Sequence, residues 1–470
     1  MPSPQRANGW SRRAFLKAGV AGAALAAACP RELFAGPAAR PNVIVILADD
    51  LGLGDVSCFA PQTKTPTPHV DRIAREGIAF TDAHSSSAVC TPTRYGILTG
   101  RYPWRTRLVK GVLGNYAEPL IEKERLTLPG LLKRVGYKTA CFGKWHFGWD
   151  WPPGKDKDFT KPIEGGPTAR GFDYYFGVDD PKRPPYCFIE NNRTVGLPTE
   201  QRPDDAPNGA SAGPMLPGWK FDEMLPTITD KAVAWIDEQA RAKQPFFIYF
   251  PLTSPHRPIA PSKEFAGKSG HGPLADFILE TDAVAGRLMA ALERNGVARN
   301  TLLIFTSDNG AAGQGRGAGF KGGKHGIYEG GHRVPFVARW PERIAPGGKS
   351  EEILCLNDLF ATCAAIVEAK LPADCGEDSV NMLPALLNER RAAPLREAIV
   401  HQAASGQLAI RQGPWKYVEA FEGRQGGPEQ LFNLAEDPAE DRNVLASQRE
   451  TAARLAGLLD KYRREERSRP

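Results

Sequence analysis

Four runs of apolar residues along the chain end in the same way, at charged or amide side chains. The runs span residues 43–47, 137–142, 246–251 and 302–306. The first run, 43–47, is apolar without alternation and predicts a strand that is buried on both faces of a sheet, and the other three are further strand candidates. Helical patterns lie between them, at residues 68–76, 128–135, 228–242 and 273–295. Strands that alternate with helices predict an α/β fold with a mostly parallel central sheet flanked by helices.

The polar residues that follow these runs are the first candidates for a functional site. In a parallel sheet, ligands bind beyond the carboxyl ends of the strands. We therefore expect all four strands to deliver their terminal side chains to one edge of the sheet. These side chains are Asp49 and Asp50, Lys144 and His146, His256, and Asp308 and Asn309.

Two parts of the chain depart from this alternation. Residues 148–219 are rich in Pro, Gly and aromatic residues, which predicts a long irregular insertion. Its rings either stack on sugar faces at the mouth of a site or pack on one another. From about Ala393, short strand patterns and a helix from about Ser447 predict a smaller C-terminal α+β domain. The expected domains are a signal segment at 1–35, a catalytic domain at 36–392 and this unit at 393–470.

The composition excludes several classes of protein. Of the 470 residues, 41% are hydrophobic and 24% are charged, which is typical of a folded globular chain rather than a disordered one. The formal charge is +6, but the first 35 residues hold five basic side chains and one acidic side chain. The remainder is close to neutral, at +2. We therefore expect no binding of nucleic acid.

The N-terminus has the pattern of an export signal. A run of small and apolar residues, 18–28, follows Ser11-Arg12-Arg13-Ala14-Phe15-Leu16-Lys17, and the whole resembles a twin-arginine signal. The run is too short to span a bilayer, so no transmembrane anchor is expected. The resemblance implies export by the twin-arginine translocase to the periplasm or the medium, with cleavage after Ala35. Lipoprotein anchoring at Cys29 is the less favoured alternative.

The most specific motif in the chain is Cys90-Thr91-Pro92-Thr93-Arg94, followed four residues later by Leu98-Thr99-Gly100. It resembles the signature of the formylglycine-dependent sulfatase family, in which most members have Ser where this chain has Thr93. The resemblance extends over about residues 40–370. Residues 171–190 are similar to the arylsulfatase A and N-acetylgalactosamine-6-sulfatase branch. The family resemblance implies an alkaline-phosphatase-like fold.

Cys90 on its own would indicate cysteine chemistry, because a thiol beside the first turn of a helix has a lowered pKa. The family resemblance implies a different nucleophile. A formylglycine-generating enzyme oxidises Cys90 to an aldehyde, whose hydrate is a geminal diol. One diol oxygen attacks sulfur and releases the alcohol, and the other expels sulfate as the aldehyde re-forms. The expected activity is hydrolysis of sulfate esters, on a sulfated small molecule or polysaccharide.

Metal binding is indicated by the oxygen ligands at the strand ends. Taken singly, Asp49-Asp50 fits a turn cap after a strand, and Asp308-Asn309 fits an Asx turn. Together they match the metal ligands of the sulfatase family, with the modified Cys90 as a further ligand. Carboxylate and amide oxygens select a hard cation over zinc. One Ca²⁺ is therefore expected, with Mg²⁺ as the alternative.

The resemblance also implies roles for five basic residues. Arg94 would hold the diol and the ligand carboxylates in place. Lys144 and Lys324 match the family's sulfate-binding lysines. His146 would assist the diol hydroxyl during elimination of sulfate, and His256 would contact sulfate and protonate the leaving oxygen.

Two other functions compete with the sulfatase interpretation. The first is a related phosphate or phosphonate monoester hydrolase. Two-zinc phosphatases of this superfamily offer Asp-x-x-x-His, and none of the eight histidines here has Asp four residues before it. The second is a catalytically inactive carbohydrate-binding homologue, in which Cys90 would stay unmodified. The sequence identifies neither the sugar nor the sulfated position.

Overall fold

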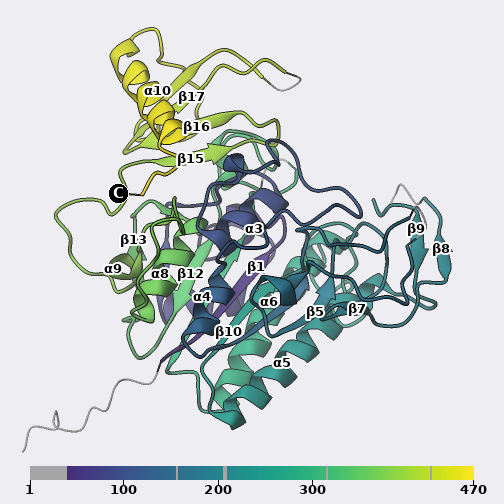
Figure 1. Cartoon of the computed structure of the whole chain (residues 1–470). Coiled ribbons are helices and arrows are strands. Elements are labelled where there is room, and N and C mark those ends of the chain that lie inside the picture. Colours follow the sequence, from purple (N-terminus) through teal and green to yellow (C-terminus); the bar gives the residue numbers. More distant parts are fainter. Residues whose placement is uncertain (1–39, 155–156, 205–208, 314–315, 424–425, 470) are drawn as a thin grey trace, which may run out of the picture. The chain divides into compact units, whose positions relative to one another are not determined.

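A ten-stranded sheet forms the centre of the fold (Figure 1). The computed structural model describes residues 40–154, 157–204, 209–313, 316–423 and 426–469. The strand order is β13-β2-β12-β11-β1-β10-β4-β5-β6-β7. Its central strands all run parallel: β11 (Thr301–Ser307), β1 (Asn42–Ala48), β10 (Phe246–Pro251), β4 (Lys138–Lys144) and β5 (Tyr174–Val178). The expected α/β fold with a mostly parallel sheet is confirmed.

The sheet is mixed only at its two sides. On one side β12 (Phe336–Arg339) and β2 (Ile78–Phe80) pair antiparallel, and β13 (Gly348–Ser350) adds a parallel strand to β2. On the other side β6 (Ile189–Glu190) and β7 (Arg193–Thr194) are antiparallel. Two short ribbons lie outside the sheet, β3 (Ala83–His84) with β14 (Leu354–Cys355) and β8 (Glu200–Arg202) with β9 (Gly213–Met215).

Helices cover both faces of the sheet, as the apolar strands require. In β1, Val43 and Val45 enter one hydrophobic core while Ile44 and Ile46 enter the other, and all four are fully buried. Each such side chain stabilises the fold by roughly 1.5–3 kcal/mol. The second core is closed by α2 (Pro68–Arg75), α5 (Met224–Ala242) and α6 (Pro273–Arg294). The first is closed by α3 (Cys90–Thr99), α4 (Leu128–Arg134), α8 (Leu359–Ile366) and α9 (Leu383–Leu386).

The insertion after β4 differs from the expectation of an irregular segment. It contains β5, a parallel strand of the main sheet. Its aromatic rings pack on one another rather than lining an open surface, since Trp149, Phe172, Tyr175 and Tyr186 are all buried. Trp149 and Tyr175, for example, lie with ring centroids 5.6 Å apart. The sugar-stacking interpretation is therefore wrong for these four rings.

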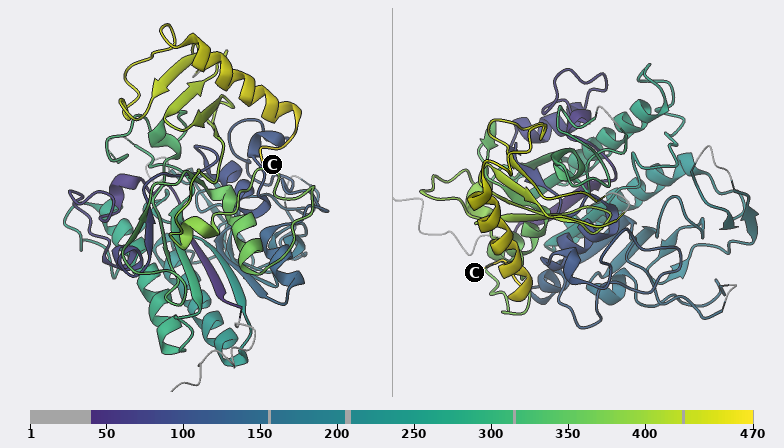
Figure 2. Two further views of the ribbon diagram at one scale, coloured as in Figure 1. Left: turned by 90° about the vertical axis from the view of Figure 1, so that its left-hand side faces the viewer. Right: turned by 90° about the horizontal axis from the view of Figure 1, so that it is seen from above.

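The C-terminal part forms the expected small α+β unit. Its sheet is antiparallel, in the order β15-β16-β17-β18, and α10 packs across it (Figure 2). The elements are β15 (Ile399–Gln402), β16 (Leu408–Gln412), β17 (Trp415–Val418), β18 (Gln430–Asn433) and α10 (Arg449–Arg464). Within the described ranges, no helix combines the length and the apolar character needed to cross a membrane.

A buried polar network joins this C-terminal sheet to the catalytic part. His84 of β3 lies 3.0 Å from His332 of α7 (Glu329–His332), Nδ1 to Nδ1, and His401 of β15 stacks on His332 with centroids 3.6 Å apart. The ammonium of Lys416 in β17 donates to Glu329 and to His332, both at 3.1 Å. Burial holds the pKa of His332 well below its usual range, so the stacked rings are neutral beside Lys416. This network fixes the chain just ahead of Cys90.

Candidate active site

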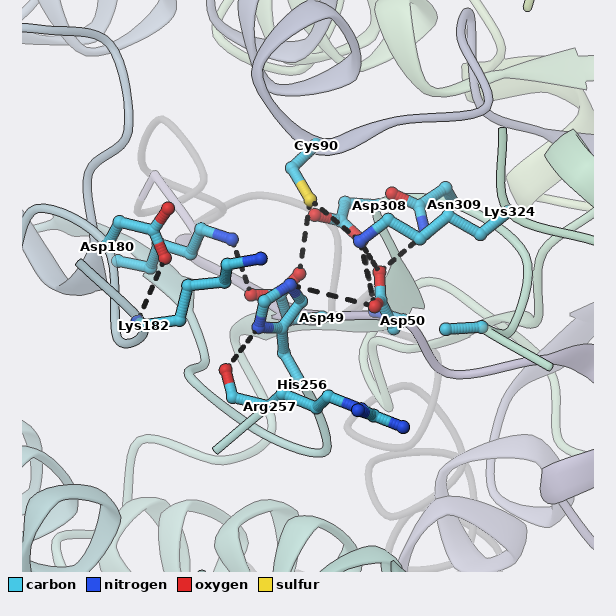
Figure 3. Close-up of polar contacts among 12 residues, drawn as sticks. Asp49, Asp50, Cys90, Asp180, Lys182, His256, Arg257, Asp308, Asn309 and Lys324 are labelled. Atoms are coloured by element: carbon cyan, nitrogen blue, oxygen red, sulfur yellow. Dashed lines mark hydrogen bonds and ion pairs between the residues drawn. The ribbon is translucent and has the colours of Figure 1, made fainter. Parts of the chain in front are cut away.

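Two neighbouring parallel strands bring the acidic residues together (Figure 3). Asp49 and Asp50 follow β1, and Asp308 and Asn309 follow β11. The backbone N–H of Asp50 donates to Asp308 Oδ1 at 3.2 Å, and Asn309 Nδ2 donates to Asp50 Oδ1 at 2.8 Å. Asp50 has φ +68°, a left-handed conformation that Asp tolerates better than most residues. The predicted juxtaposition of these four residues is present in the structure.

Helix α3 places Cys90 above these acids. Cys90 is the first residue of the helix. Pro92 is tolerated in the first turn, because the backbone N–H that proline lacks would have no partner within the helix there. Gly96 allows close packing, since a Cβ there would lie 2.0 Å from the side-chain oxygen of Asn357. Gly100 ends the helix with φ +66°. The motif residues from Cys90 to Thr99 thus form one buried helix, and the candidate nucleophile is its first residue.

The thiol of Cys90 does not have the lowered pKa that its place at a helix start predicts. Cys90 is 2% exposed, and its Sγ lies 3.5 Å from both Asp49 Oδ1 and Lys324 Nζ. Burial raises the pKa of the thiol, and the charge of Asp308 raises it further. The expectation of a lowered pKa is wrong because desolvation outweighs the helix dipole. Because the reactive form of cysteine is the thiolate, a raised pKa disfavours unmodified Cys90 as the nucleophile.

Three basic side chains are each paired with one of the aspartates. The pairs are Arg94 with Asp308 at 2.7 Å, Lys144 with Asp49 at 2.8 Å, and Lys324 with Asp50 at 2.6 Å. The members of these pairs are almost completely inaccessible to solvent, so their attraction is little screened. The lysines predicted to bind sulfate are therefore held as cations at the floor of the site.

The carboxylates respond differently to this environment. Burial opposes ionisation of Asp49, but Lys144 and His256 hold its pKa well below the usual range. Burial and the neighbouring Asp49 raise the pKa of Asp308 to about 6, against the opposing effect of Arg94. Crowded carboxylates of this kind repel one another, and a bound cation relieves the repulsion.

Several buried donor atoms lie close enough together to hold one metal ion. Asp49, Asp50, Cys90 and His256 each offer an atom within 4.8 Å of the others. Asn309 Oδ1 is buried and has no hydrogen-bond partner among the described residues, which leaves this oxygen available as a ligand. Apart from Cys90 and His256, these donors are carboxylate and amide oxygens, which suit Ca²⁺ or Mg²⁺.

The two predicted histidines occupy different places. His256, beyond β10, has Nε2 3.8 Å from Asp50 Oδ2 and faces the acids and Cys90. His146, beyond β4, has Nε2 3.3 Å from the Leu113 carbonyl and 3.6 Å from Asp180. Burial lowers the pKa of both rings, and Lys144 adds to this for His146. The structure thus brings His256 into the acidic cluster and sets His146 beside it, against Asp180.

Asp180 and Lys182, which lie on the loop after β5, were not predicted from the sequence. Asp180 is buried; it lies 3.6 Å from His146 and forms an ion pair with Arg183 at 3.5 Å. Burial would raise its pKa, but Lys144 and His146 hold the pKa below its usual range. A signal was present, because Val178-Asp179-Asp180 repeats the Ala48-Asp49-Asp50 pattern of an acidic pair after a strand. The pattern was hidden because β5 itself was not predicted.

Comparisons with known proteins identify the family of the chain. The family model described as Sulfatase matches residues 41–369. The N-acetylgalactosamine-6-O-sulfatase of Bacteroides thetaiotaomicron is 35% identical over 90% of this chain and 93% of its own length. Human arylsulfatase A is 30% identical over 86% of this chain and 83% of its own length.

Solved structures show the same fold. One from a study of glycosaminoglycan metabolism by Bacteroides thetaiotaomicron superposes with a TM-score of 0.82 at 34% identity, covering 90% of this chain and 99% of the other. The phosphonate monoester hydrolase of Agrobacterium radiobacter superposes with a TM-score of 0.63 at 22% identity, covering 91% of this chain and 96% of the other, a likeness of fold alone. The alkaline-phosphatase-like fold is thereby confirmed. With the acidic cluster, the motif helix and these likenesses together, the chain belongs to the sulfatase family and is a hydrolase of sulfuric esters.

Proposed function

We propose that this sulfatase hydrolyses sulfate esters of sugars through a formylglycine made from Cys90. The observation that carries the proposal is the position of Cys90 Sγ, 3.5 Å from both Asp49 and Lys324. A nucleophile there stands between a cation-binding carboxylate and an ammonium able to bind a sulfate oxygen. The hydrated aldehyde supplies one hydroxyl to attack sulfur and a second to expel sulfate, whereas the thiol has a raised pKa.

The other residues of the site bind, orient and move protons. Lys144 and Lys324 bind the sulfate oxygens, while Arg94 fixes Asp308. The ring of His146, whose Nδ1 has no hydrogen-bond partner among the described residues, receives a proton in the step that releases sulfate. His256 protonates the ester oxygen as the sugar departs.

The metal belongs to the same proposal. Asp49, Asp50, Asp308, Asn309 and the modified residue 90 would hold one divalent cation, Ca²⁺ first and Mg²⁺ as the alternative. Bound there, it supplies positive charge that polarises the nucleophile and offsets the charge of sulfate. The buried Asn309 Oδ1, which accepts no hydrogen bond from any residue that the structure describes, supports this assignment.

A sugar substrate is supported by the N-acetylgalactosamine-6-O-sulfatase of Bacteroides thetaiotaomicron, at 35% identity. The direct test measures release of inorganic sulfate from N-acetylgalactosamine 6-sulfate and from a nitrophenyl sulfate. Release of phosphate from the matching phosphate ester is the control. The proposal predicts sulfate release from the first two. Faster release of phosphate than of sulfate would favour the phosphohydrolase alternative.

His256→Ala is expected to separate these two sulfate esters. A sugar alkoxide leaves poorly without a proton, whereas nitrophenolate hardly needs one. General acid catalysis contributes about 10²–10⁴ in rate, so the sugar sulfate should lose a factor of that order and the nitrophenyl sulfate much less. Turnover of both esters by the purified variant measures this. Equal losses on both would show that His256 does not act as the acid.

Export belongs to the proposal as well, although residues 1–39 lie outside the described structure. Arg12 and Arg13 precede the apolar run of the signal segment. Replacing both with Lys should retain the precursor in the cytoplasm, because the translocase recognises the arginine pair. Fractionation of the producing cells measures the distribution. An unchanged periplasmic fraction would reject the twin-arginine route.

A further inference from the structure

Lys182 is a cation at the mouth of the site that the proposed mechanism does not use. Its backbone is held firmly, because its N–H donates to Asp180 at 3.1 Å and its carbonyl accepts from Ser211 N–H at 2.9 Å and Tyr186 hydroxyl at 2.8 Å. The side chain extends away from Asp180, toward Asp49 and Cys90 (Figure 3). The loop therefore aims this ammonium at the place where substrate must pass.

The charge of Lys182 is not matched by a carboxylate. Arg94, Lys144 and Lys324 each have an aspartate partner. Lys182 has no ion pair with Asp or Glu within the part of the chain that the structure describes. Among the described residues, Lys182 is thus a cation at this site without a carboxylate partner, and a divalent cation at the acids would add further positive charge. A substrate with a single sulfate ester brings only one negative charge.

Lys182 is also less buried than two groups at the centre of the site. Lys144 is fully buried and Cys90 is 2% exposed, whereas Lys182 is only half-buried. Burial lowers the pKa of His325, and the nearby charges of Lys324 and Lys182 lower it further. His325 and Lys110 border a cavity of about 520 Å³. Because Lys182 is less buried than Lys144 and Cys90, its ammonium stays accessible to a part of the substrate outside this buried centre.

We propose that Lys182 binds a second anionic group of the substrate, either the carboxylate of a uronic acid or a second sulfate, on the sugar unit next to the ester that is cleaved. This inference rests on the proposed function and names the class of substrate that the same site prefers, which is an anionic glycan bearing more than one charge. A charge-assisted hydrogen bond at a half-buried position is strong enough to affect selection among such glycans.

The test compares three disaccharides that share one 6-sulfated N-acetylgalactosamine. Its neighbour is a neutral hexose, a uronic acid or a hexose with a second sulfate. Lys182→Gln should raise KM about tenfold for an anionic disaccharide and leave kcat within about twofold, while the neutral one stays within about twofold in both. The anionic disaccharide whose KM rises shows whether Lys182 binds a carboxylate or a sulfate. Lys182→Arg should restore KM, and added salt should weaken the wild-type preference.

Lys349→Gln is the matched control, because it removes an exposed lysine at β13, on the other side of the sheet. It should behave as wild type. Equal loss on all three disaccharides, or no change on any, would overturn the role of Lys182. If the wild-type protein releases no sulfate from any of them, the proposed function fails instead. In that case calorimetric affinities of the same three disaccharides for wild type and Lys182→Gln still decide the role of Lys182.

Discussion

Cys90→Ala is expected to lose at least about 10³-fold in turnover of every sulfate ester, because it removes the atom from which the nucleophile is made. Cys90 is 2% exposed and lies at the start of α3, against Asp49 and Lys324. A water molecule at the vacated position has neither the geometry nor the second hydroxyl needed to expel sulfate. Sulfate release under saturating substrate measures the loss.

Cys90→Ser is the matched control for folding and packing. It keeps a polar side chain of similar size at the first turn of α3 but has no thiol to be oxidised. Both variants should unfold within a few degrees of wild type, and both should lack activity. Activity of Cys90→Ala above one tenth of wild type would contradict the assignment of the nucleophile.

Asp308→Ala is expected to lose both the metal and turnover, by at least about 100-fold. Asp308 Oδ1 accepts from the N–H of Asp50, and Oδ2 accepts from Arg94 at 2.7 Å. The substitution therefore removes a ligand and leaves the buried Arg94 without its partner. Elemental analysis of purified protein should find one Ca²⁺ or Mg²⁺ per wild-type chain and almost none in the variant.

A second buried acid serves as the control for this result. Asp282 accepts hydrogen bonds from the backbone at the start of α2, at 2.8–3.1 Å, and lies outside the acidic cluster. Asp282→Asn should lower stability but retain the metal. Stoichiometric zinc in the wild-type protein, removed by a chelator together with activity, would count against an oxygen-ligated hard cation.

The sequence pattern was sufficient to predict those strands that are buried on both faces, because burial requires a run of apolar residues. The run at 43–47 lies within β1 (Asn42–Ala48), and that at 302–306 within β11 (Thr301–Ser307), because side chains buried on both faces must be apolar. The same logic did not detect β5. Its residues Tyr174 to Val178 stand among Pro, Gly and other aromatic residues, and only the neighbouring β4 makes this short segment a strand.

The residues of the candidate site were likewise predicted only in part. Asp49, Asp50, Asp308 and Asn309 could be placed at one edge because parallel strands end together. Lys182 could not, since its loop depends on β5. The pKa of Cys90 was predicted in the wrong direction, because sequence reveals the helix start but not the burial and the nearby Asp308 that dominate.

The central claim is that a formylglycine at position 90 carries the hydrolysis of sulfate esters. The most direct measurement is mass spectrometry of the peptide containing Cys90 in preparations made with and without a formylglycine-generating enzyme, with sulfate release assayed on each preparation. If residue 90 is a formylglycine, the peptide is about 18 Da lighter than its thiol form and turnover is proportional to the converted fraction. Full turnover in a preparation that holds only the unmodified thiol would contradict it.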